Sequence, residues 1–197
     1  ITQAQDERKL THVNWGQIEK VAKAHPDSIK ALVARLILPQ LDTTLTMSQR
    51  VLAFYGQTYI SRGGEALDVM HMNDSLRAGA SGTLAMANKV LAKNPLNLEA
   101  LMCKATVLFG MAKTNTADST ELKTQARHCM RVAMRLYNTI ASTGRGTAEE
   151  PFSVTSVGDE YSFINYYLDI WKIKGQSLVY TGKNNVPCDI IHLNEKS

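Results

Sequence analysis

The sequence predicts an α+β fold that is mainly α, with tetratricopeptide-like helical hairpins followed by a small C-terminal antiparallel β meander. Three observations carry this prediction. Only 12 Gly and 5 Pro occur in 197 residues, which favours long helices. Apolar residues recur at helical spacing as far as Ala141. Beyond Pro151, Val, Ile, Tyr, Phe and Thr become frequent and alternate as they do in strands.

The first half of the chain predicts four helices, separated by strong breaks. Asn14 suits the N-cap of the first helix, Pro26 and Pro39 bracket the second, and Arg62-Gly63-Gly64 ends the third. The expected helices are Trp15–Ala24, Ile29–Leu38, a segment from Thr46 or Ser48 to Ile60, and Glu65–Leu76.

Three further helices are expected before the composition changes. Asn94-Pro95 separates the first two of them, and Asn97 is a suitable N-cap. Thr143-Gly144 closes the longest helix. These helices are Leu84–Ala92, a segment from Asn97 to about Lys113, and Glu121–Ala141.

Residues 146–197 are expected to form a β-rich extension packed on the helical region 1–145, as one structural unit. Gln176–Tyr180 and Cys188–Leu193 resemble strands, and Phe152–Val157 also alternates. Tyr161–Trp171 allows two interpretations. Its aromatic and β-branched content favours a strand, which is the interpretation adopted, whereas Asp159-Glu160 would suit a helix start.

Short strings repeat along the helical region. Lys30-Ala31-Leu32, Glu65-Ala66-Leu67 and Glu99-Ala100-Leu101 are spaced by 35 and 34 residues, a period typical of tetratricopeptide repeats. The segment ANKVLAKNPLNLEALMCKA resembles such a repeat closely and predicts that Ala100 lies at a tight helix crossing. The middle unit lacks the preceding proline, so a generic helical bundle stays an alternative.

The whole chain also resembles a particular family. The residues that carry the resemblance are DTTLT, Ala53-Phe54-Tyr55-Gly56, LAKNPLNLEAL, GRGTAEEPFSVTSVGDEY, Gly175-Gln176-Ser177-Leu178 and Cys188-Asp189. They are similar to an uncharacterised family, a domain of unknown function from exported proteins of gut-type anaerobic bacteria. The resemblance implies export to the periplasm or cell surface behind a removed signal peptide or lipid anchor upstream of Ile1. It implies no catalytic residue.

Composition and motifs exclude several classes of function. The net charge of +4 is mild, so no nucleic-acid partner is expected. No apolar run is long enough for a transmembrane segment. HExxH, CxxC, GxSxG and phosphate-loop motifs are absent, so no catalytic residue, metal or cofactor is predicted.

Whether Cys103 and Cys129 form a disulfide is left open. Cys188 and His192 would lie about 13 Å apart along a strand, which argues against a nucleophilic pair.

A basic stripe runs along the longest predicted helix. Lys123, Arg127, Arg131 and Arg135 are each four residues apart and share one face. Two interpretations follow. The stripe either is solvated or meets carboxylates of the same chain, such as those of residues 149, 150, 159 and 160, or it binds an acidic peptide, a polyanion or an anionic surface. The opposite side of the helix is expected to carry the apolar residues Leu122, Ala126, Cys129, Met130, Ala133, Leu136 and Ile140.

Aromatic residues gather just before the C-terminal strands. The cluster is Tyr161, Phe163, Tyr166, Tyr167 and Trp171. It is either a core layer or a recognition surface, since exposed Tyr and Trp serve as binding anchors. Tyr161, Tyr167 and Trp171 are therefore candidate binding residues together with the four cations of the stripe.

These observations favour a non-catalytic module that binds or scaffolds an unidentified protein or peptide, acidic if the stripe contacts it. The alternative is an enzyme or small-ligand-binding protein with a site at the junction of the helices and the β meander. A structural component of an envelope assembly is the third interpretation.

Overall fold

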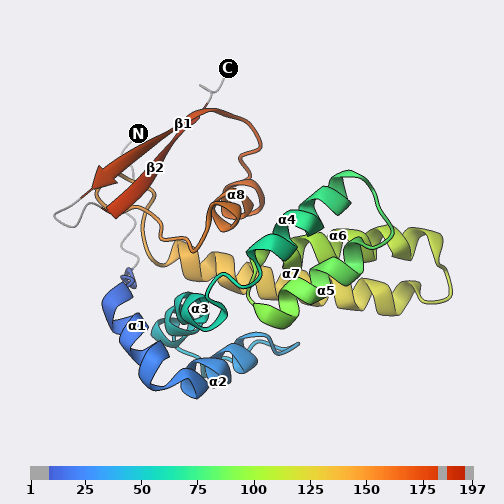
Figure 1. The fold of residues 1–197 in the computed structure, drawn as a ribbon, viewed down its shortest axis with the longest axis horizontal. Coiled ribbons are helices and arrows are strands. Elements are labelled where there is room, and N and C mark those ends of the chain that lie inside the picture. Colours follow the sequence, from blue (N-terminus) through green and yellow to red (C-terminus); the bar gives the residue numbers. More distant parts are fainter. Residues whose placement is uncertain (1–8, 182–185, 194–197) are drawn as a thin grey trace.

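The computed structural model describes residues 9–181 and 186–193, which form eight helices and one two-stranded antiparallel sheet (Figure 1). The predicted α+β fold, mainly α, is confirmed. The elements are α1 (Trp15–Ala24), α2 (Pro26–Leu36), α3 (Met47–Ser61), α4 (Ala66–Arg77), α5 (Thr83–Lys93), α6 (Leu98–Thr114), α7 (Ser119–Ala141), α8 (Val157–Tyr166), β1 (Ile173–Thr181) and β2 (Val186–Leu193).

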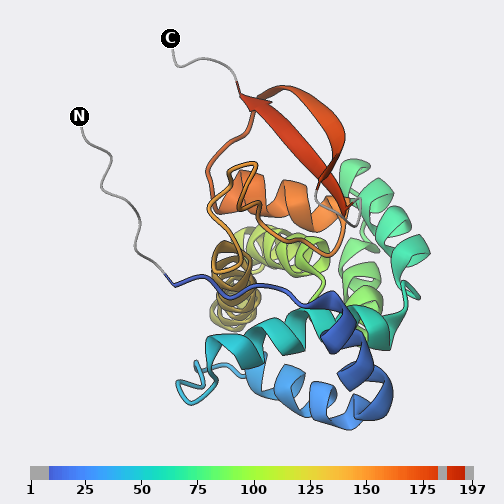
Figure 2. The same ribbon diagram turned by 90° about the vertical axis from the view of Figure 1, so that its left-hand side faces the viewer.

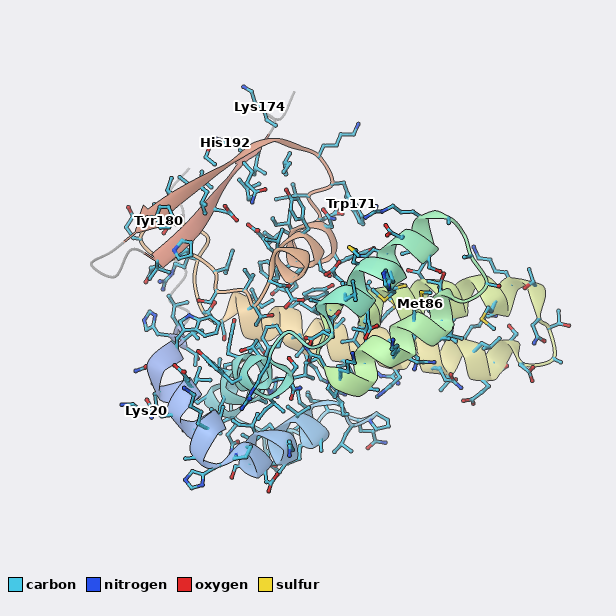
Figure 3. All side chains as sticks on the ribbon, in the orientation of Figure 1. Lys20, Met86, Trp171, Lys174, Tyr180 and His192 are labelled. Carbon is cyan, nitrogen blue, oxygen red and sulfur yellow. The ribbon has the colours of Figure 1, made fainter. Side chains whose placement is uncertain are left out.

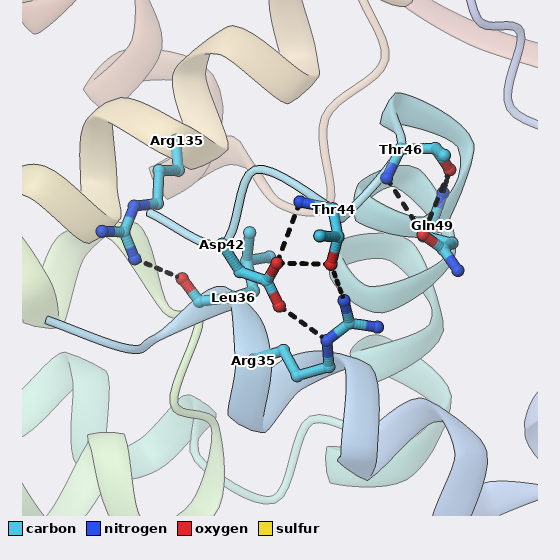
Figure 4. A network of polar contacts seen from close by, with 7 residues as sticks. All are labelled: Arg35, Leu36, Asp42, Thr44, Thr46, Gln49 and Arg135. Carbon is cyan, nitrogen blue, oxygen red and sulfur yellow. Dashed lines mark hydrogen bonds and ion pairs between the residues drawn. The ribbon is translucent and has the colours of Figure 1, made fainter. Parts of the chain in front are cut away.

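Side-chain caps fix where several helices begin. The Asn14 side chain accepts a hydrogen bond from the Gln17 amide at 3.0 Å, and Asn97 accepts one from the Ala100 amide at 2.9 Å. Both N-caps were expected from the sequence and are confirmed. Thr46 and Gln49 cap α3 reciprocally, as Figure 4 shows.

The helices form two groups that meet at α7. Figures 1 and 2 show α1, α2 and α3 packed together at one end, while α4 and α5 lie against α6, which pairs with α7. Successive hairpins α4–α5 and α6–α7 stack as the tetratricopeptide-like repeat predicts. The hairpin α2–α3 departs from that order, because α3 packs on α7. Regular stacking is therefore seen in two hairpins of the described chain.

Small residues sit where helices cross closely. Ala100 is fully buried and packs with Met72 of α4 and with Ala87 and Val90 of α5, as its position in the repeat predicts. Gly56 of α3 faces Ile29 of α2, and a Cβ on Gly56 would come within 2.9 Å of the Ile29 side chain. These contacts set the distance between α6 and the hairpin α4–α5 and the distance between α2 and α3.

The strand expected at 161–171 is wrong, because α8 occupies most of this segment. Ser156 caps α8 by accepting a hydrogen bond from the Asp159 amide at 3.1 Å, and Asp159 and Glu160 lie in its first turn. Acidic residues in this position are favoured by the helix dipole. The helix buries Phe163 and Ile164 against the core, so local capping outweighs the β propensity of the segment.

The β meander is smaller than expected. Residues 152–157 do not form a strand, and Ser153 is bonded to other segments instead: its amide donates to Oγ1 of Thr143, just beyond α7, at 2.9 Å, and its carbonyl accepts from Tyr55 of α3 at 2.7 Å. The sheet is the single hairpin β1–β2, which pairs Thr181 with Val186 and Val179 with Cys188. In Figures 1 and 2 this hairpin lies beyond α8, on the side away from α1–α3.

Two further expectations concern the thiols and the membrane. Cys103 and Cys129 are buried free cysteines, so they form no disulfide with each other. Within the described residues, no helix combines the length and the apolarity that crossing a membrane requires.

Candidate functional site

The fold separates Arg135 from the rest of the predicted basic stripe. Arg135 is only 7% exposed, and its guanidinium donates to the carbonyls of Leu36 and Leu38 at 2.7 and 2.6 Å and to that of Pro39 at 3.3 Å. Figure 4 shows the first of these bonds. Arg135 therefore satisfies carbonyl groups at the C-terminus of α2, where a cation also suits the helix dipole. Burial, Arg131 and Arg50 lower the pKa of this guanidinium.

The other three cations of the stripe lack partners within the described part of the chain. Arg127 and Arg131 are exposed and Lys123 is half-buried, and none of them forms a hydrogen bond or ion pair with a described residue. Two of the carboxylates suggested as partners are engaged elsewhere, since Glu150 pairs with Arg145 and Asp159 accepts a hydrogen bond from Thr155. The three cations are thus available to an external group.

Two methionines share the exposed face with these cations. Met130 and Met134 are 44% and 46% exposed, so the expectation that Met130 lies on the buried side is wrong. At 100° per residue, both methionines fall with the cations inside an arc of about 100°, which explains the exposure. We call this set the basic face of α7; it consists of Lys123, Arg127, Met130, Arg131 and Met134.

A pocket of about 330 Å³ adjoins the basic face. Lys104 of α6 and Arg131 of α7 bring two cations to it, and His128 joins them. Its lining is Pro39, Lys104, Thr124, Gln125, His128, Cys129 and Arg131. The residues that line it include no acid, so the pocket is electropositive.

Half-buried His128 brings a buried ring nitrogen to this pocket. Desolvation lowers its pKa, and Arg131, Arg135 and Lys104 lower it further by repulsion. The buried Nδ1 of the imidazole has no hydrogen-bond partner among the described residues. An anion in the pocket would relieve the repulsion that keeps the proton off His128. Sequence reasoning missed His128 and Lys104 because they meet only through the packing of α6 on α7.

The three aromatic candidates do not form one surface. Tyr161 is half-buried and donates from its hydroxyl to Gln176 of β1 at 2.7 Å. Tyr167 stacks on buried Phe163 with ring centroids 5.0 Å apart. Trp171 is 60% exposed on the connection from α8 to β1, where Figure 3 labels it, and its indole donates to Asp169 at 2.8 Å. Tyr161 and Tyr167 thus join elements, while Trp171 faces solvent.

A second pocket, of about 450 Å³, lies between α4, α6 and α8. Asn73, Glu99, Met102, Tyr161 and Tyr166 are among the residues that line it. Asn73 donates its side-chain amide to Glu99 Oε2 at 2.8 Å. The sequence did not reveal this pocket, although Tyr161 was a candidate binding residue, because its walls come from three distant segments of the chain.

Two carboxyl groups of α8 have strongly shifted acidities. Asp159 is 3% exposed, and burial raises its pKa to about 7, with a smaller contribution from Glu99 and an opposing hydrogen bond from Thr155. Burial and the nearby Asp189 of β2 raise the pKa of Glu160 to about 7 as well. Asp159 belongs to the contact of α8 with α6, and Glu160 to the contact of α8 with the hairpin.

No family model, curated protein or solved structure matches the chain. No group of three or more His, Cys, Asp or Glu side chains within residues 9–181 and 186–193 is arranged to hold a metal ion. The fold and the two pockets define a helical protein with one electropositive surface and one acidic, aromatic pocket.

Proposed function

We propose that this protein is a non-catalytic binding module whose basic face on α7 binds an acidic segment of a protein or peptide partner. The observation that carries the proposal is the absence of intramolecular ion pairs for Lys123, Arg127 and Arg131 in the described chain. Like charges four residues apart on a helix cost about 0.2–0.5 kcal/mol per pair. An external carboxylate would offset this cost.

The composition of the face indicates the kind of partner. Arg and Met are both enriched in protein interfaces, and methionine adapts its shape to different apolar side chains. Met130 and Met134 lie beside the cations and are nearly half exposed. A partner segment that offers carboxylates along one line and apolar side chains along another would match both components. We therefore expect an acidic amphipathic segment.

The adjoining pocket extends the same surface. Lys104 adds a positive charge beside Arg131, in a recess of about 330 Å³ that can receive one carboxylate side chain. The mild net charge of +4 and the methionines of the face favour a protein segment over nucleic acid. Location at the periplasm or cell surface is part of the proposal and rests on the family resemblance of the sequence.

Fluorescence polarisation with a labelled peptide of alternating glutamate and leucine tests the proposal. The wild-type protein should bind it, and affinity should fall as NaCl rises from about 50 to about 300 mM because salt screens the charges. Replacing Arg127 and Arg131 by Gln should abolish most of the binding and most of its salt dependence. The same peptide with lysine in place of glutamate should not bind.

A matched control removes two charges elsewhere. Lys20 of α1 and Lys174 of β1 are exposed and lie on parts of the molecule away from α7 (Figure 3). The variant Lys20→Gln/Lys174→Gln should keep wild-type affinity. Equal loss of binding in both double variants would show a nonspecific effect of net charge and would refute the proposed site.

Stability distinguishes a binding face from a structural one. The change Arg127→Gln/Arg131→Gln should leave the free energy of unfolding unchanged or raise it slightly, because it removes like-charge repulsion. If the cations were structural, the same change should destabilise the protein by stranding their carboxylate partners. Urea unfolding of both double variants measures the sign.

A further inference from the structure

The pocket between α4, α6 and α8 is built around one carboxylate. Glu99 stands in the first turn of α6, and Asn73 of α4 holds its Oε2 at 2.8 Å. Its Oε1 lies against the backbone of Gly158 in α8, where a Cβ would come within 1.8 Å of that oxygen. Three elements therefore fix the position of this carboxylate, and only glycine at 158 leaves room for it.

No cation neutralises Glu99 within the described residues. It forms no ion pair there, and no Lys, Arg or His lines the pocket. Glu65 and Asp159 are buried nearby, and Glu99 and Glu65 both act on Asp159 electrostatically. The pocket therefore has a negative potential that a positively charged ligand would offset.

The rest of the lining is apolar and aromatic. Tyr161 and Tyr166 line the pocket together with Leu76, Met102 and Val157. Trp171 packs edge-on against Tyr166 with ring centroids 5.1 Å apart. Aromatic rings attract cations and also pack against apolar groups. A volume of about 450 Å³ lies in the range of small-molecule sites.

We propose that this pocket binds a small organic amine, with the ammonium group on Glu99 and an apolar body against Met102 and the two tyrosines. This site is separate from the basic face of α7 and does not depend on the function proposed for that face. The carboxylate selects the charge of the ligand, and the rings select its apolar body.

Calorimetric titration with phenethylamine tests the charge selection. The amine should bind to the wild-type protein, while phenethyl alcohol and 3-phenylpropionate, which match its shape but are neutral and anionic, should not. Replacing Glu99 by Gln, which keeps the size and the acceptor oxygen, should weaken amine binding about tenfold or more. The control Glu121→Gln removes one negative charge from exposed α7 and should keep wild-type affinity.

A second variant tests the pocket independently, in case Glu99→Gln does not fold. Thr106 lines the pocket but is exposed, so Thr106→Trp should fill the pocket, leave the core intact and abolish amine binding. Equal binding of the alcohol and the amine would overturn the proposal. Undiminished amine binding in Thr106→Trp would also overturn it. So would a wild-type protein that does not bind the amine, whatever the effect of Glu99→Gln on stability.

Discussion

Replacing Asp159 by Asn should remove the part of the pH dependence of stability that this buried carboxyl contributes. Asp159 is fully enclosed at the contact of α8 with α6, and its pKa is raised from the ordinary 3.8 to about 7. Between these values the folded protein keeps a proton that the unfolded chain has released. The contribution of Asp159 to stability is therefore greatest below about pH 4, and it falls as the pH rises toward 7.

The size of the effect follows from the pKa shift. Each pKa unit corresponds to about 1.36 kcal/mol, so a shift of about three units costs roughly 4 kcal/mol once Asp159 is ionised in the folded state. About 2 kcal/mol of this loss should occur between about pH 5 and about pH 7. Asparagine has nearly the same size and no charge, so the variant should lack this part of the pH dependence.

Urea unfolding at several pH values, followed by circular dichroism, measures the difference between the wild type and Asp159→Asn. The pKa of His128 is lowered, which gives the opposite sign, but His128 is common to both proteins and cancels in the difference. Glu160 also has a pKa raised to about 7, but it is common to both proteins and cancels in the same way. A difference between wild type and Asp159→Asn that stays constant from about pH 5 to about pH 8 would refute the reasoning.

Three further predictions concern single side chains. Ala100→Leu should overpack the contact of α6 with α4 and α5 and lower the free energy of unfolding by about 1–3 kcal/mol, measured by urea denaturation. Arg135→Met should cost about 1–3 kcal/mol because it leaves the carbonyls at the end of α2 without a donor, and Arg135→Lys should recover part of that loss. Cys188 should react with iodoacetamide no faster than an ordinary free thiol, because burial, Asp189 and Glu160 raise its pKa.

The helices were predictable because their ends are encoded locally. Asn14 and Asn97 cap the helices that follow them, and Arg62 takes up the left-handed conformation at the end of α3, before Gly63. These signals act within a few residues, so no tertiary information is needed. Helix α8 shows the limit of this reasoning, because β propensity and capping disagreed there and the Ser156 cap prevailed.

The surroundings of Arg135 and of Glu99 were less predictable than the helices, because they depend on contacts between distant segments. The spacing of the stripe identified Arg135, but only the packing of α7 against the end of α2 assigns its guanidinium to backbone carbonyls. Glu99 appeared in the sequence as part of a repeat string. Its position between Asn73 and Gly158 requires three elements that are far apart along the chain.

The most direct test of the proposed function is an NMR titration of the isotope-labelled protein with the glutamate–leucine peptide. We predict that the side-chain signals of Arg127 and Arg131 and the methyl signals of Met130 and Met134 shift together and saturate, while those of Lys20 and Lys174 do not move. Absence of shifts, or shifts confined to other faces of the protein, would contradict the assignment of α7 as a binding surface.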